Sequence, residues 1–367
     1  MDLSYYMPTK LLMGENVVEK NKSIFSIYGK SALIVTGKNS AKSSGALDDV
    51  INALNSYKIS YTVFDKIMPN PTVDVVYLGA SVAKENNCDF VIAIGGGSPM
   101  DAAKAISALT KNNVSKEDVF NSSKYHDIMP MIFIPTTAGT GSEVTQYSIL
   151  TDDKNETKTS IASTLFFPNV ALLDAKYMKN LGRATTINTA IDALCHAIES
   201  YLSKRNTLVS EIFSLEAIRL IAKEFNNLKK YNLDYNSRSN LLYASSLAGI
   251  AIAHTSTVVV HVMGYPLTYY RDIDHGRANG LVLLQYLYKV NESYPDKINK
   301  LLEALNLTSL KEFDNVISSL LGEKENVSLD EIKKFASNSM KKKNVSNSIV
   351  ELTENDLIDM YSNVFLK

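Results

Sequence analysis

The chain is poor in cysteine, in net charge and in long apolar runs, and each shortage argues against a class of protein. It has two cysteines in 367 residues and no CxxC spacing, so we expect free, buried thiols in a reducing compartment. The formal net charge of −1 gives no reason to expect nucleic acid or an anionic membrane as a partner. No uncharged apolar run approaches the roughly 20 residues that span a bilayer. The opening MDLSYYMPTKLLMG lacks the basic and apolar regions of a signal peptide, so we expect a cytoplasmic protein.

The first half of the chain alternates short apolar runs with helical patterns. Because 367 residues exceed the usual size of one hydrophobic core, we expect two domains. The expected strands are 31–36, 61–65, 89–95, 131–137, 147–150 and 170–174, and the expected helices start near 45, span about 73–87 and cover 100–109. Strands that alternate with helices in this way predict a doubly wound, mostly parallel sheet.

The second half has a different character. Segments with a 3.6-residue period follow one another at roughly 186–203, 207–229, 236–253, 255–264 and 280–291, with more towards the end. Clusters of β-branched residues bounded by turns are nearly absent, so we expect an all-helical domain. The stretch MKNLGRATT is the best candidate for a linker. We therefore predict an α/β domain over 1–180 and a helical domain over 181–367.

One carboxylate and three imidazoles form a candidate metal site. Asp192 and His196 are four residues apart in an amphipathic helical pattern, so both side chains point to one place on the helix. His261 and His275 follow later in the chain, and such a mixed nitrogen and oxygen set suits iron(II) or zinc. A buried Asp–His hydrogen bond inside a helical bundle remains the alternative interpretation.

The stretch IAIGGGSPMDAAKA places three glycines and Ser98 between an expected strand and an expected helix. Glycine lets backbone N–H groups come close to a ligand, and a helix N-terminus attracts anions, so we favour a pyrophosphate cradle over Gly95–Ser98. The alternative is a tight turn that requires positive φ. The dinucleotide fingerprint GxGxxG and the Walker loop are both absent from the sequence.

A second glycine-containing stretch, IPTTAGTGSEVTQYS, is rich in hydroxyl groups. It contains Thr136, Thr137, Thr140, Ser142 and Thr145 around two glycines, after an expected strand. Ligands of open α/β sheets bind at the carboxyl ends of the strands. The loop is therefore a candidate for holding the rest of a nucleotide.

Together, GGGSPMDAAK, PTTAGTGSE, IDALCHAIE and the downstream histidine pair resemble the iron-containing (group III) alcohol dehydrogenases over nearly the whole chain. The resemblance implies a nucleotide-binding α/β domain, a helical metal-binding domain and an active site in the cleft between them. It also implies a divalent ion, iron(II) or in some relatives zinc(II), that holds the alcohol oxygen while hydride passes to nicotinamide.

The resemblance also assigns roles to individual residues. The metal ligands are Asp192, His196, His261 and His275. The pyrophosphate loop and the helix after it contain Gly95, Gly96, Gly97, Ser98, Asp101 and Lys104. The nicotinamide side has Thr136, Thr137, Thr140 and Ser142, and further cofactor contacts are Asn70, Lys158 and Leu181.

The chain departs from the family pattern at two places. Many members have Asp after the first nucleotide-binding strand, where this chain has Gly37 and Lys38, so we predict a preference for NADP(H) over NAD(H). Many members also have a second His four residues after the third ligand, where this chain has Tyr265. We place Tyr265 and His275 at the catalytic centre, and we interpret His254 as a core or surface histidine.

The predicted function is metal-dependent hydride transfer between NADP(H), with NAD(H) as the alternative, and a small primary alcohol or aldehyde of the butanol or propanediol type, by a homodimer. One alternative is a zinc-dependent polyol oxidoreductase that resembles glycerol dehydrogenase, or a protein similar to dehydroquinate synthase. Another is a non-catalytic nucleotide-binding protein in which the His/Asp cluster is structural. A metal hydrolase is disfavoured because it leaves both glycine-rich loops unexplained.

Overall fold

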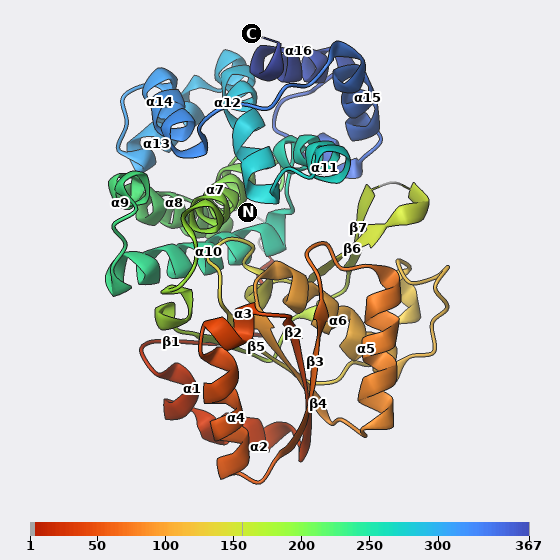
Figure 1. Cartoon of the computed structure of the whole chain (residues 1–367). Helices are drawn as coiled ribbons and strands as arrows, with labels where there is room; N and C mark the ends of the chain where they lie inside the picture. The colour runs from red at the N-terminus through yellow and green to blue at the C-terminus, as the bar shows by residue number, and fades with distance from the viewer. Residues whose placement is uncertain (1–3, 156, 367) are drawn as a thin grey trace. The chain divides into compact units, whose positions relative to one another are not determined.

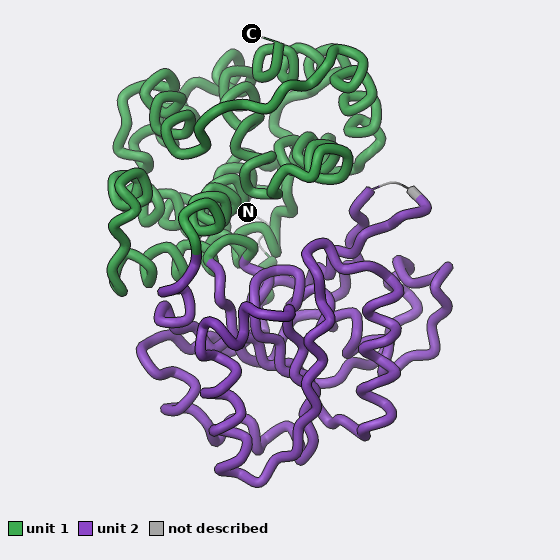
Figure 2. Tube along the Cα trace, in the orientation of Figure 1, with its two compact units in different colours: residues 1–6, 138–140, 182–367 green, residues 7–137, 141–181 purple. Residues whose placement is uncertain are grey.

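The computed structural model describes residues 4–155 and 157–366, which form two compact units (Figure 2). The α/β unit consists of residues 7–137 and 141–181, and the helical unit consists of residues 4–6, 138–140 and the chain from Gly182 onward. The expected change of character near residue 180 therefore lies beside the point where the main chain passes from one unit to the other. The short segment 138–140, in the middle of the threonine-rich loop, also belongs to the helical unit.

A six-stranded parallel sheet is the centre of the α/β unit, which confirms the predicted doubly wound fold (Figure 1). Its strands in spatial order are β1 (Lys10–Met13), β8 (Val170–Leu173), β5 (Met131–Pro135), β4 (Phe90–Gly95), β2 (Ser31–Gly37) and β3 (Ser60–Ile67). All of their pairings are parallel. Because parallel strands are covered on both faces, the central strands are continuous apolar runs rather than alternating ones.

Alternate residues of the central strands β2, β4 and β5 enter two separate cores, one on either face of the sheet. Leu33 and Val35 of β2 pack in one core, while Ile34 between them packs in the other. The helices of this unit are α1 (Val17–Lys20), α2 (Phe25–Tyr28), α3 (Ser40–Ser43), α4 (Ala46–Ser56), α5 (Val73–Glu85) and α6 (Gly97–Lys111). Helices α5 and α6 cover the first face, and α1, α2 and α4 cover the second (Figure 1).

The sequence predicted the central strands and helices of this unit but missed some elements at its edges. Strand β1 escaped detection because it has only four residues, and β7 (Thr157–Ala162) because its sequence, TKTSIA, is mostly polar. Strand β7 pairs antiparallel with β6 (Tyr147–Asp152) as a separate two-stranded sheet. Helix α6 begins at Gly97, three residues before the predicted start, so part of the glycine-rich stretch is helical.

The helical unit has the all-helical character that the sequence predicted. From Gly182 onward its helices are α7 (Arg183–Tyr201), α8 (Leu208–Lys223), α9 (Phe225–Lys230), α10 (Tyr235–Thr255), α11 (Val259–Arg271), α12 (His275–Ser293), α13 (Pro295–Leu305), α14 (Leu310–Leu321), α15 (Leu329–Met340) and α16 (Glu354–Phe365). The segment expected at 207–229 is two helices. The one expected from 255 begins at Val259, because Ser256 has φ of 60° and interrupts the chain between α10 and α11.

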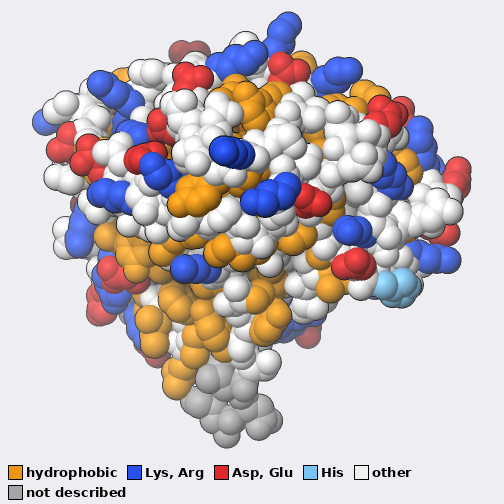
Figure 3. All heavy atoms as spheres, turned by 90° about the horizontal axis from the view of Figure 1, so that it is seen from below, with side chains coloured by type: hydrophobic (Ala, Val, Ile, Leu, Met, Phe, Trp, Pro, Cys, Tyr) orange, Lys and Arg blue, Asp and Glu red, His pale blue; other side chains and the backbone are white. Residues whose placement is uncertain are grey.

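Charges of both signs are interspersed on the face shown in Figure 3, where no continuous basic surface gathers over the described residues. Within residues 4–155 and 157–366, no single helix has the length and apolar character needed to cross a membrane. Helices α10 and α11 reach that length and apolar composition only when they are taken together, across the sharp bend between them.

Candidate functional site

Helix α7 carries three buried polar residues along one side. Asp192, His196 and Glu199 lie four and three residues apart, which places them on one face of the helix. Each is less than one-tenth exposed, in a helix that is otherwise lined by Ala, Ile and Leu. Such a row of buried polar side chains is stable only when the groups are paired with one another or with a ligand.

The other two predicted histidine ligands come to this face from the starts of two other helices. His261 is the third residue of α11, and His275 is the first residue of α12. Asp274 caps α12 by accepting a hydrogen bond from the Gly276 backbone N–H at 3.2 Å, which fixes the start of the helix and therefore the position of His275.

Close packing of α12 on α7 depends on two glycines, four residues apart on α12. A Cβ added at Gly276 would overlap the Asn188 carbonyl oxygen, and one at Gly280 would lie 2.5 Å from Ile191 Cγ2. At Gly276 the two backbones therefore approach directly, and at Gly280 the Ile191 side chain fills the space that a Cβ would need. The approach places His275 beside Asp192.

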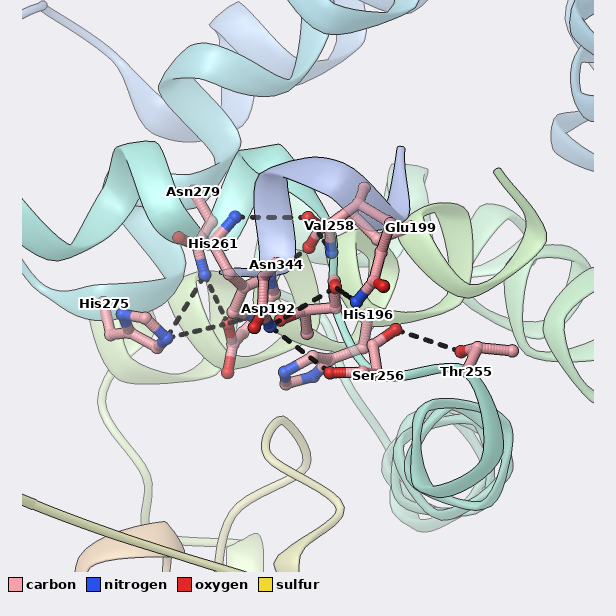
Figure 4. Close-up of polar contacts among 12 residues, drawn as sticks. Asp192, His196, Glu199, Thr255, Ser256, Val258, His261, His275, Asn279 and Asn344 are labelled. Carbon is pink, nitrogen blue, oxygen red and sulfur yellow. Dashed lines mark hydrogen bonds and ion pairs between the residues drawn. The ribbon is translucent and has the colours of Figure 1, made fainter. Parts of the chain in front are cut away.

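Three of the four predicted ligands converge. One donor atom each from Asp192, His261 and His275 lies within 4.8 Å of the other two. His261 Nε2 is 3.5 Å and His275 Nε2 is 4.0 Å from Asp192 Oδ1 (Figure 4). Two ligands of a tetrahedral ion, each about 2.1 Å from it, are about 3.4 Å apart, so the donor spacing fits a divalent metal.

The buried Nε2 atom of His261 supports the same assignment. It accepts or donates no hydrogen bond among the described residues, although it is fully enclosed. In the neutral ring, a buried nitrogen without a hydrogen bond is costly, and a metal ion would satisfy its lone pair. The nitrogen and oxygen donors suit iron(II) or zinc.

His196, the fourth predicted ligand, lies next to this group but outside it. Its ring stacks on the His261 ring with centroids 4.3 Å apart, and its Nδ1 is 3.3 Å from the Gly139 carbonyl oxygen. Gly139 can lie this close to α7 because it has no side chain: an added Cβ would be 2.7 Å from Thr189 Cβ. The role of His196 as a ligand stays a prediction.

Electrostatics make the site attractive to a cation. Burial would raise the pKa of Asp192, but the surrounding imidazoles, His196 first, outweigh burial and hold that pKa below its usual value. Burial would lower the pKa of His261, but the carboxylates of Glu199 and Asp192 raise it to about 10. Burial lowers the pKa of His196 to about 4. A divalent ion would interact favourably with the carboxylates that now stabilise a proton on His261.

Two contacts of this site were missed by the sequence analysis. Glu199 Oε2 contacts His261 Nδ1, and Asn279 Nδ2 donates to Asp192 Oδ1 at 2.9 Å. Glu199 carried a local signal, because it is an acidic residue one turn after His196 on the apolar side of the helix. The signal for Asn279 was weaker: it lies four residues after His275, and therefore on the same face if both residues are helical.

Tyr265 lies beside the candidate metal site. Its ring is parallel to that of His275, with centroids 5.6 Å and planes 9° apart. His254 lies elsewhere in the helical unit: its Nε2 accepts from the Tyr6 backbone N–H at 3.1 Å, and its ring stacks on Tyr5. These contacts account for His254 without a ligand.

In the α/β unit, the predicted cofactor residues gather at the carboxyl ends of neighbouring strands. Gly95 ends β4 opposite Pro135 of β5, and its carbonyl accepts from the Thr136 backbone N–H at 2.9 Å. The Asn70 backbone N–H, after β3, lies 3.3 Å from Ser98 Oγ. Gly37 ends β2 in the same sheet. Ligands of parallel sheets bind at this edge.

The two glycine-containing loops touch at Gly96. A Cβ there would lie 2.9 Å from Thr137 Oγ1, so any larger residue would require the Thr137 side chain to shift. Helix α6 starts immediately afterwards at Gly97, and its first-turn N–H groups offer donors to an anion. The geometry is therefore compatible with the predicted pyrophosphate cradle.

A buried polar network lies beneath this edge. Lys104 Nζ donates to Ser142 Oγ at 2.8 Å, to Thr145 Oγ1 at 3.2 Å and to the Tyr147 carbonyl at 2.8 Å. Ser142 Oγ in turn donates to Asp101 Oδ1 at 2.7 Å. Burial lowers the pKa of Lys104 to about 8. Lys104 and Ser142 thus connect α6 to the threonine-rich loop.

The other predicted cofactor residues lie at separate places in the chain. Lys38 is exposed directly after β2, and Lys158 lies on β7. Burial raises the pKa of Asp101, and the charge of Lys158 is the weakest of the effects that oppose this rise. Leu181 is half-buried at the end of the α/β unit, and Thr140 belongs to the helical unit. Their cofactor contacts stay predictions.

Comparisons with known proteins account for both units. Residues 8–175 match the family model described as iron-containing alcohol dehydrogenase, and residues 186–365 match the C-terminal model of the same family. The chain belongs to the iron-containing alcohol dehydrogenase family. As a family member it is an oxidoreductase that acts on CH–OH groups, and the family implies a metal and a nicotinamide cofactor.

Individual members of the iron-containing alcohol dehydrogenase family are similar over most of their length. The 1,3-propanediol dehydrogenase of Klebsiella pneumoniae is 33% identical over 84% of this chain and 81% of its own. The NADPH-dependent butanol dehydrogenase of Clostridium saccharobutylicum is 31% identical over 79% of this chain and 74% of its own. The crystal structure of an iron-containing alcohol dehydrogenase from Thermotoga maritima has a TM-score of 0.92 at 37% identity and covers 99% of both chains.

Proposed function

We propose that the chain transfers hydride between NADP(H) and a small primary alcohol or aldehyde of the butanol or propanediol type, with iron(II) or zinc(II) as its metal. The convergence of Asp192, His261 and His275 carries this proposal, because it supplies a cation site in a family of alcohol oxidoreductases. The names of the two relatives support the substrate class.

The proposed roles follow from the chemistry of alcohol oxidation, which removes a proton and a hydride. When bound, a divalent ion supplies a Lewis acid that lowers the pKa of a hydroxyl or polarises a carbonyl. Asp192, His261 and His275 would hold the ion, with His196 as the predicted fourth ligand. Neutral imidazoles and one carboxylate leave the ion with net positive charge, which the proton-releasing step requires.

In the α/β unit, the glycine-rich turn and the N-terminus of α6 would hold the pyrophosphate of the cofactor. The threonine-rich loop would hold the nicotinamide side. Proper alignment is the main contribution of the protein, since the cofactor itself carries the hydride.

The cofactor preference rests on two residues after β2. Gly37 has no carboxylate to repel a ribose 2′-phosphate, and the exposed Lys38 offers a positive charge. The NADPH-dependent butanol dehydrogenase among the relatives is consistent with this preference.

The proposed activity is tested by oxidation of NADPH and NADH with butyraldehyde, 3-hydroxypropanal and glyceraldehyde, for enzyme loaded with iron(II) or zinc and for enzyme stripped by chelator. We expect NADPH oxidation with the first two substrates, lost with the chelator and restored by metal. A preference for glyceraldehyde with zinc would instead support the enzyme that resembles glycerol dehydrogenase. Nucleotide binding without turnover on any substrate would support the non-catalytic alternative.

Gly37→Asp tests the cofactor preference separately. The new carboxylate would lie beside the 2′-phosphate, a like-charge contact, so we expect the ratio of kcat/KM for NADPH to that for NADH to fall by at least about tenfold, roughly 1.4 kcal/mol. Gly37→Asn is the matched control, because it adds similar bulk without charge. Equal efficiency of the unmodified enzyme with both cofactors would refute the NADP(H) preference. The homodimer and the cytoplasmic location stay predictions.

A further inference from the structure

Glu199 is buried one turn beyond His196 and accepts three hydrogen bonds from Val258 and His261, at the start of α11. Its Oε2 contacts His261 Nδ1, while its Oε1 accepts from the backbone N–H groups of Val258 at 2.9 Å and His261 at 3.2 Å (Figure 4). The Glu199 side chain is fully enclosed. A single carboxylate thus holds both the ring and the backbone of His261.

The backbone contacts compensate for a missing helix cap. The residue before α11 is Val258, whose apolar side chain makes no cap hydrogen bond. The first-turn N–H groups of a helix need acceptors, and in many helices a Ser, Thr, Asp or Asn side chain supplies one. Here Glu199 of α7 supplies it, which ties the start of α11 to the helix that carries Asp192.

The ring contact fixes which nitrogen of His261 carries hydrogen. A carboxylate only accepts, so the contact with Glu199 requires hydrogen on Nδ1. In the neutral ring, Nε2 then has a free lone pair, and it is Nε2 that lies 3.5 Å from Asp192 Oδ1. Metal-ligating histidines commonly donate their other ring N–H to a carboxylate, which fixes the ring and raises its basicity.

We propose that Glu199 is a positioning residue that holds His261 in the Nδ1–H tautomer, with Nε2 directed at the metal. This inference rests on the proposed metal-dependent function. It predicts that removing the acceptor at Nδ1 weakens the metal site even when the fold is retained.

Glu199→Gln is the decisive variant. Its amide oxygen can still cap α11, but its NH₂ group would face Nδ1 and favour the opposite tautomer, with hydrogen on Nε2. We expect the dissociation constant for Zn²⁺, measured on the metal-free chain by competition with a chromophoric chelator, to rise 10- to 100-fold. Glu224→Gln is the matched control, because the buried Glu224 accepts from Asn227 and Asn240, each at 2.8 Å, away from the site. It should leave the constant within twofold.

A spectroscopic measurement separates positioning from mere support of the fold. In the parent chain with ¹⁵N-labelled histidine, we expect His261, assigned by the signal lost in His261→Gln, to be protonated on Nδ1 and to have Zn²⁺ on Nε2. Zn²⁺ on Nδ1 of the parent, or unchanged Zn²⁺ affinity in a Glu199→Gln chain that loses no helicity, would overturn the inference and leave the proposed function intact. A parent chain that binds neither Zn²⁺ nor iron(II) would overturn both. The parent measurement decides the matter even if Glu199→Gln fails to fold.

Discussion

At the scale of single residues, the two ring nitrogens of His261 have different environments. One contacts the carboxylate of Glu199, and the other lies near Asp192 without a hydrogen bond among the described residues. His275 makes the third corner of the site, and Asn279 donates to Asp192. Glu199 and Asn279 thus hold the donor atoms in place without being among the three converging ligands. Hydrogen bonds from such outer residues commonly orient the ligands of a metal site.

Tyr265 is the residue whose contribution to the chemistry is easiest to isolate. An unperturbed tyrosine has a pKa of about 10, so a hydroxyl is a poor general base near pH 7. The parallel contact with His275 needs only the ring, which phenylalanine retains. We therefore expect Tyr265→Phe to keep kcat within about tenfold, a barrier change of roughly 1.4 kcal/mol, and to change mainly the relative kcat/KM of different aldehydes.

Steady-state kinetics on butyraldehyde and 3-hydroxypropanal measure this effect, with metal content checked in parallel. Turnover reduced by several orders of magnitude, in a variant that retains metal and cofactor, would show instead that the hydroxyl takes part in proton transfer.

At the scale of elements, the packing of α12 on α7 decides whether the candidate metal site exists. His275 and Asp192 are on different helices, and Gly276 lets the helices approach. Ridges of ordinary side chains would separate the helix axes by 8–10 Å. Glycine at the contact permits a closer approach, and the first turn of α12 then lies directly on α7.

Gly276→Ala is expected to disrupt this approach. The added methyl overlaps the Asn188 carbonyl, which belongs to helix backbone and yields little, so we expect a loss of about 1–3 kcal/mol of stability and weaker Zn²⁺ binding. Gly182→Ala is the control, because Gly182 lies before α7 with nothing within 4 Å of an added Cβ. Thermal unfolding and Zn²⁺ titration test both variants. Parent-like stability and affinity in Gly276→Ala would mean that the helices do not depend on this contact.

At the scale of the whole molecule, the polar groups of the two units serve different needs. The helical unit concentrates carboxylates and imidazoles in its interior, while the α/β unit encloses the cation of Lys104 among hydroxyls and a carbonyl. A buried ammonium lowers stability unless its hydrogen bonds compensate fully. The stability of the α/β unit should therefore depend on pH through Lys104.

The sign of that dependence follows from the pKa of Lys104, which burial lowers from 10.5 to about 8. Between these values the unfolded chain keeps the proton and the folded chain has released it, so stability rises with pH across that window. The difference between these two pKa values corresponds to roughly 3 kcal/mol of folding stability, which is lost again as pH falls through about 8. Lys104→Met should lack this rise.

Urea unfolding followed by circular dichroism at pH 7 and pH 10 measures the difference between parent and Lys104→Met, in which the titration of groups remote from Lys104 cancels. We expect the parent to gain stability relative to the variant by about 2–3 kcal/mol over this range. A difference that is constant or shrinks as pH rises would contradict the lowered pKa of Lys104 in the folded chain.

The sequence by itself determined what short-range patterns encode. Apolar runs with the correct length predicted β2, β4 and β5, and 3.6-residue periodicity predicted the helical half. The spacing of Asp192 and His196 placed both on one face of α7, because four residues make about one turn. The glycine-rich stretch could be identified as a candidate anion-binding turn because the glycines and Ser98 are consecutive in the sequence.

Only the tertiary structure decided the contacts between distant segments. The pairing of Glu199 with His261 spans 62 residues, and no local pattern shows which of the acidic side chains a histidine will meet. The ring stack of His196 on His261 and its contact with the Gly139 carbonyl likewise join distant segments of the chain. Strand β1 forms because β8 offers it an edge, which four residues do not reveal. Periodicity describes one element at a time, whereas a site and a sheet edge depend on how elements pack.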